Sequence, residues 1–67
     1  MRFVTIQTKW GDSVAINTNN IASIKVDNGS VLIFTSGDKP IVTQFTDIEH
    51  AVDYLQRAPS LSLGSVA

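Results

Sequence analysis

IASIKVDNGSVLIF, residues 21–34, is the stretch of this sequence that decides the fold. Asn28 and Gly29 stand between two runs rich in β-branched residues, and an Asn-Gly pair tolerates the positive φ angles of a two-residue hairpin turn. With this pair as the loop, Val26 lies opposite Val31, and alternate side chains of each strand point to the same face. The residues that share the first face of the predicted hairpin are Ile24, Val26, Val31 and Ile33.

The second face of this hairpin is apolar only on its second strand, at Leu32 and Phe34. A turn at Gly37 followed by a strand from Ile41 to Phe45 places Phe34 opposite Ile41, with Phe45 further along the same side. The last two strands are then apolar on both faces, whereas one short helix covers only one face of a small sheet. We expect the second face to be buried either by closure of the sheet within the chain or by a second copy.

Another hairpin is predicted before the central one. Residues 2–8 alternate as a strand, and a three-residue loop that ends at Gly11 leads into a strand over residues 12–17. This loop pairs Ile6 with Val14, so that the apolar side chains of both strands face the same way.

The apolar spacing changes to the helical period after residue 45. Thr46 followed by Glu49 is a capping box, and Asp47 stands favourably at the positive end of the helix. The helix should end near Ala58, because Pro59 disfavours helical backbone in the residue before it. Its predicted buried stripe consists of Ile48, Ala51, Val52 and Leu55.

The predicted fold class is α+β: a five-stranded antiparallel β-meander, open or curled into a barrel-like form, followed by one C-terminal helix. The asparagine-rich corner at residues 17–20 predicts a turn of irregular or 3₁₀ structure between the two hairpins. Residues 1–58 should form a single domain, and residues 59–67 a flexible tail. The alternation Ser-Leu-Ser-Leu in this tail is also compatible with a short strand at a sheet edge.

Composition narrows the classes of function. The 67 residues contain no cysteine and one histidine, which argues against disulfides and metal sites, and we predict no cofactor. No apolar run approaches the roughly 20 residues that span a bilayer, so we expect a cytoplasmic protein without membrane contact. A core this small favours association, and we expect a homo-oligomer. The basic residues are scattered rather than clustered: Arg2, Lys9, Lys25, Lys39 and Arg57.

No group of residues predicts catalysis. His50 falls off the buried stripe of the helix and lacks a neighbouring nucleophile, which indicates a surface histidine. Asp47 and Glu49 are explained by the helix start, and Asp53 stands four residues before Arg57 as an exposed ion pair. We therefore predict that the protein is not an enzyme.

Trp10, at a predicted loop tip, either folds over the sheet rim as part of the core or stays exposed as a contact anchor. The residues predicted to form an interface are Trp10, Leu32, Phe34, Ile41 and Phe45.

The order of elements over residues 4–57 resembles the small flagellar and swarming-motility proteins of the FlbD type, and many short bacterial and phage proteins of the same layout. The positions that carry the resemblance, besides the apolar pattern, are Gly11, Asn17 and Gly37. The family's Pro-Asp-Thr central turn is replaced here by residues 28–30, Asn-Gly-Ser. The acidic residue that follows the family's last strand is also missing, with Thr43-Gln44 in that region. The resemblance implies the same architecture and assigns no functional residue.

These observations predict a small protein-interaction or regulatory module that self-associates through the second face of its sheet. One alternative is a nucleic-acid-binding β scaffold, in which the contacts would come from Lys9, Trp10, Lys25 and Lys39. Another is a module that binds a small ligand in a pocket between subunits.

Overall fold

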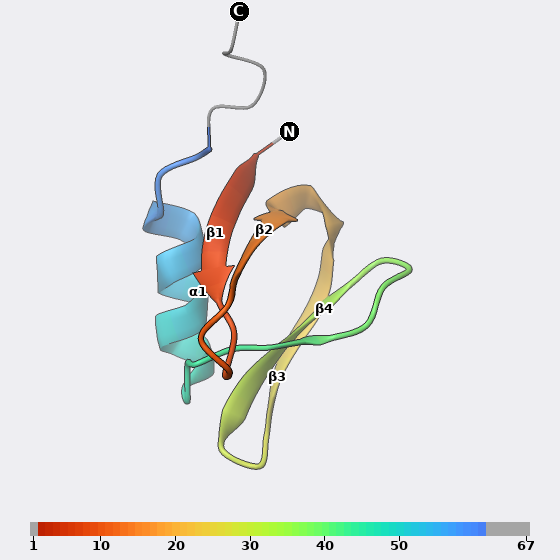
Figure 1. The fold of residues 1–67 in the computed structure, drawn as a ribbon, viewed down its shortest axis with the longest axis vertical. Helices are drawn as coiled ribbons and strands as arrows, with labels where there is room; N and C mark the ends of the chain where they lie inside the picture. Colours follow the sequence, from red (N-terminus) through yellow and green to blue (C-terminus); the bar gives the residue numbers. More distant parts are fainter. Residues whose placement is uncertain (1, 62–67) are drawn as a thin grey trace, which may run out of the picture.

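The computed structural model describes residues 2–61 of the 67-residue chain. Within them it has the predicted α+β class, with antiparallel strands followed by one helix (Figure 1). The elements are β1 Phe3–Gln7, β2 Ser13–Asn17, the 3₁₀ turn η1 Thr18–Asn20, β3 Ile21–Asp27, β4 Ser30–Thr35, β5 Ile41–Val42 and α1 Ile48–Arg57. Of the tail predicted at residues 59–67, residues 62–67 lie outside the described part.

Both predicted hairpins are confirmed with their registers. In the central one Val26 pairs with Val31, and the turn residues Asn28 and Gly29 have φ angles of 52° and 76°. In the first one Ile6 pairs with Val14 across the predicted loop. Residues with positive φ therefore stand where the turn chemistry of the sequence required them.

The prediction of one five-stranded meander is wrong, because the strands divide between two open sheets. β1 pairs with β2 in one sheet, whereas β3, β4 and β5 form the other. The chain turns away between β2 and β3 at η1, where the Asn17 side chain accepts a hydrogen bond of 3.0 Å from the Asn19 N–H. The sheets touch where Thr8 bridges Thr43, but within residues 2–61 they do not close into a barrel.

The predicted register between the last two strands is also wrong, by one residue. Ile41 pairs with Ile33 instead of Phe34, and regular pairing ends at Val42 instead of Phe45. Beyond Val42 the ladder is irregular: the Val31 carbonyl accepts from the Thr43 N–H, while the Val31 N–H donates to Phe45, each at 2.9 Å. Because side chains alternate, this shift exchanges the faces of every residue in β5.

The helix lies alongside β1, and its extent agrees with the prediction (Figure 1). Its N-cap is Asp47, whose carboxylate accepts from the His50 N–H at 3.0 Å, so the predicted cap at Thr46 is wrong. Asp is as good a capping residue as Thr, and here it is the residue placed one step before the first helical turn.

One core lies between the first hairpin, β4 and the helix. Its buried residues are Val4, Ile6, Ile16, Ile33, Leu55 and Ala58. Two side chains predicted in the core are more exposed: Val26 is 44% exposed and Ile48 is 37% exposed. Val26 stands near the tip of the central hairpin, which projects beyond the first hairpin in Figure 1. Ile48 is the first residue of the helix.

Candidate functional site

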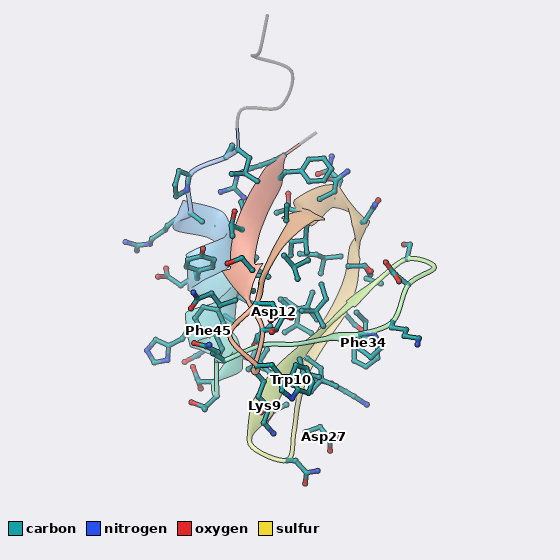
Figure 2. The ribbon with its side chains drawn as sticks, viewed as in Figure 1. Lys9, Trp10, Asp12, Asp27, Phe34 and Phe45 are labelled. Atoms are coloured by element: carbon teal, nitrogen blue, oxygen red, sulfur yellow. The ribbon has the colours of Figure 1, made fainter. Side chains whose placement is uncertain are left out.

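One side of the three-stranded sheet faces away from the core. Its apolar residues Leu32, Phe34 and Val42, together with Trp10 from the loop of the first hairpin, form what we call the outer face. Leu32 and Val42 are paired across β4 and β5, and both are half-buried. Phe34 follows Leu32 on the same side of β4 and is also half-buried. Figure 2 shows Trp10 and Phe34 on this part of the molecule.

Among residues 2–61, Trp10 is the most exposed of the large apolar side chains, at 72%. Its backbone is nevertheless fixed. The Trp10 N–H donates to the buried Thr8 hydroxyl at 3.3 Å, and the Gly11 N–H donates to the Thr8 carbonyl at 3.0 Å. The Lys9 N–H donates to the Val42 carbonyl at 2.8 Å, which ties the hairpin tip to β5. Of the two alternatives for Trp10, the structure shows the exposed one.

A shallow hollow of about 190 Å³ lies beside Trp10. Leu32 and Val42 form its apolar part, and Lys9 and Asp27 place one charge of each sign at its border. The Lys25 ammonium stands 5.4 Å from the centre of the Phe34 ring, within the range of a cation–π contact. The outer face is therefore an apolar patch with a mixed-charge border, the pattern of a protein contact surface.

The structure brings together only part of the predicted interface. Trp10, Leu32 and Phe34 lie on the outer face, whereas Ile41 and Phe45 pack against the core. Val42 was absent from the predicted interface, because the predicted register of the last strand turned its side chain toward the core. The sequence pattern does not distinguish the two registers of this strand, because Ile41 and Val42 are consecutive and both apolar.

Residues considered for catalysis or metal binding lie on the helix or at its N-cap, where two pairs of side chains are in contact. The His50 side chain is 83% exposed and contacts Asp47 at 3.1 Å, while Asp53 pairs with Arg57 at 2.8 Å. No group of three metal-binding side chains gathers within residues 2–61. Among the same residues, no helix has the length and apolar character to cross a membrane.

Compared with family models, curated proteins and solved structures, the chain finds no match. The resemblance to FlbD-type proteins therefore stays a prediction. What the molecule does has to be inferred from its own surface.

Proposed function

We propose that this protein is a non-enzymatic interaction module that self-associates through the outer face. The observation that carries the proposal is the placement of Trp10, a tryptophan 72% exposed on a backbone held by three hydrogen bonds, next to Leu32 and Val42. A fixed backbone reduces the conformational entropy that is lost on binding, and tryptophan is enriched among the residues that dominate interface energies.

The exposed area of the Trp10 side chain sets the expected strength of self-association. A tryptophan buries roughly 150–250 Å² when covered, so a ring 72% exposed offers on the order of 110–180 Å². At about 25 cal/mol per Å² the upper limit is roughly 3–4.5 kcal/mol per ring, from which ordering and association costs are subtracted. Removing the ring should weaken a dimer by at least about 30-fold, equivalent to about 2 kcal/mol.

The test is light scattering on a sizing column across concentrations up to the high micromolar range. The 7.3-kDa chain should give a mass that rises with concentration. Trp10→Ser and Leu32→Glu should remain at the monomer mass. Ile48→Glu is the matched control, because it also replaces an exposed apolar side chain by a charge, at a helix N-terminus that favours it. A strict monomer throughout, or equal loss in the control, would overturn the proposal.

Trp10 also supplies its own spectroscopic signal, since it is the sole tryptophan of the chain. Association through the outer face should shift its fluorescence to shorter wavelength as concentration rises, because the ring leaves water. An association seen by light scattering without this shift would place the interface elsewhere on the molecule.

Nucleic-acid binding is the second candidate. Lys9 and Trp10 border the same hollow, and Lys25 stands over Phe34, so two cations and two rings share one side. Lys39 lies apart, beside a hollow lined by β2 and the β4–β5 loop, and Asp27 opposes binding of phosphate at the outer face. A single-stranded oligonucleotide that binds with steep salt dependence and quenches Trp10 would favour this function over self-association.

A small ligand held between subunits is the remaining alternative. It requires the assembly to form first, and a ligand should then raise the melting temperature further as its concentration increases.

A further inference from the structure

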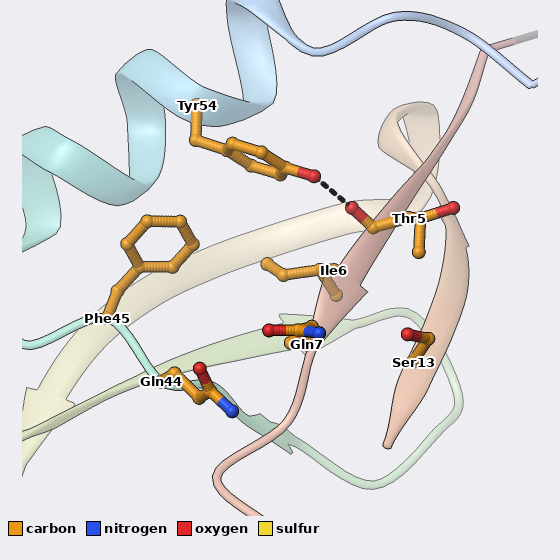
Figure 3. A pocket seen from close by; sticks show the side chains of 7 residues that line it. All are labelled: Thr5, Ile6, Gln7, Ser13, Gln44, Phe45 and Tyr54. Atoms are coloured by element: carbon orange, nitrogen blue, oxygen red, sulfur yellow. Dashed lines mark hydrogen bonds between the residues drawn. The ribbon is translucent and has the colours of Figure 1, made fainter. Parts of the chain in front are cut away.

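The outward edge of β1 borders a cleft of about 490 Å³ that is separate from the outer face (Figure 3). Thr8 bonds with Asp12 across the first hairpin, so the alternate residues Phe3, Thr5 and Gln7 direct their backbone groups to the other edge. We propose that this edge binds an extended, uncharged peptide segment of a partner protein as an added strand.

The carbonyl groups of Phe3, Thr5 and Gln7 on this edge each accept a hydrogen bond from a different part of the chain. The Phe3 carbonyl accepts from the Leu61 N–H at 2.8 Å, and the Gln7 carbonyl accepts from the Gln44 N–H at 3.3 Å. Between them, the Thr5 carbonyl accepts from the Tyr54 hydroxyl, as Figure 3 shows. Backbone N–H groups of the chain itself thus already bond to the edge at both ends, and the Tyr54 side chain bonds between them.

Two donors are left over. The N–H groups of Thr5 and Gln7 point to the same edge, and no acceptor within residues 2–61 takes either of them. Two residues of a strand span about 6.7 Å, which is also the spacing of carbonyl groups at positions i and i+2 of an extended peptide. A single carboxylate or phosphate group is too small to accept from both. The spacing selects a peptide backbone, the mode of recognition by strand addition.

The walls of the cleft select the side chains of the peptide. Every lining residue is uncharged: Thr5, Ile6, Gln7, Ser13, Gln44, Phe45 and Tyr54. The rings of Phe45 and Tyr54 stand 5.4 Å apart at 47° and offer an aromatic wall to one apolar side chain. A charged peptide would lose hydration here without gaining a partner. The proposal does not depend on self-association through the outer face.

The experiment is a titration of the full-length ¹⁵N-labelled protein with the peptide acetyl-Ser-Val-Thr-Leu-Ser-amide, followed by amide NMR. The amide protons of Thr5 and Gln7 should move downfield with saturation and exchange more slowly with solvent. The control peptide acetyl-Ser-Asp-Thr-Asp-Ser-amide should leave them in place. The absence of saturable shifts up to about 5 mM, or shifts confined to the outer face, would overturn the proposal.

Two substitutions separate the backbone from the side chain. Gln7→Pro removes one outward N–H and leaves the bonds from β1 to β2, because that N–H points away from β2. It should weaken peptide binding about fivefold, the effect of one lost hydrogen bond. Gln7→Val keeps the N–H and should bind nearly as the parent does. Equal weakening in both variants would show that the amide side chain and not the strand edge binds. If the proline variant does not fold, the amide shifts of Thr5 and Gln7 in the parent protein alone decide whether the peptide binds at this edge.

Discussion

Arg2 closes the C-terminal end of α1, which lies more than fifty residues further along the chain. Its Nη1 donates to the Leu55 carbonyl at 2.6 Å, and its Nη2 donates to the carbonyls of Ala58 and, at 3.4 Å, Gln56. The last carbonyls of a helix have no partner within it, and the helix dipole makes that end negative. A guanidinium at this end donates hydrogen bonds to the carbonyls and offsets the negative end of the helix dipole. It also links α1 to the residue that precedes β1.

The structure sets the size of this effect. Two of the three contacts are short, and each hydrogen bond contributes about 1 kcal/mol net, with the dipole adding roughly 0.3–1 kcal/mol. Because the site is only part-buried, water replaces some of the loss. Arg2→Met keeps the apolar stem and should lower the free energy of unfolding by about 2 kcal/mol. For a domain of this size that corresponds to a melting temperature lower by roughly 8–16 °C.

Thermal and urea unfolding followed by circular dichroism measure this loss. Arg2→Lys keeps the charge but not the fork of donors, so it should fall between the parent and Arg2→Met. Arg57→Met is the matched control, since it removes an exposed arginine whose partner is Asp53, and it should cost less than about 0.5 kcal/mol. If Arg2→Met costs no more than this control, Arg2 does not stabilise the end of the helix.

Further substitutions test other local features by the same unfolding measurements. Asp47→Ala should cost about 1 kcal/mol through loss of the N-cap, whereas Thr46→Ala should be nearly neutral; the reverse order would restore Thr46 as the cap. Thr43→Val should cost about 1–3 kcal/mol, because the fully buried hydroxyl donates to the Val31 carbonyl, and a neutral result would contradict that role. Gly29→Ala should cost about 1 kcal/mol at its φ of 76°, and an unchanged stability would argue against the turn geometry.

Local chemistry made the hairpins and the helix predictable. Asn28-Gly29 and Gly11 each mark a backbone position with positive φ, and a turn of known length fixes the register of the strands beside it. The helix was predictable from its apolar period and from Pro59 beyond its end. In each case the signal and the structure that it specifies lie within a few residues of one another.

The division into two sheets depends on contacts between distant segments. Whether β3 pairs with β2 is decided by how the corner at η1 turns the chain and by the bridge from Thr8 to Thr43. The asparagines of the corner indicate a turn but not its direction. The Arg2 cap on α1 was unpredictable for the same reason, because no pattern within either segment points to the other.

The register of β5 shows how a one-residue ambiguity alters a functional inference. Ile41 and Val42 satisfy the core in either register, so the apolar pattern does not choose between them. In the predicted register Thr43 shares the second face with Ile41 and Phe45, yet it is fully buried and its hydroxyl donates to the Val31 carbonyl. With Ile41 inside and Val42 outside, the outer face is narrower than the sequence indicated.

A narrow outer face limits the strength of self-association. A stable interface buries at least about 500 Å² on each partner, roughly a ninth of the 4567 Å² surface of this chain. Trp10 supplies at most about a third of that area, and Leu32, Phe34 and Val42 are already half-buried. The remainder must come from polar neighbours such as Lys9 and Asp27, whose charges would have to find opposite partners on the second copy. We therefore expect association in the micromolar range or weaker, which is why Trp10, the one large exposed contributor to the outer face, should decide whether it occurs.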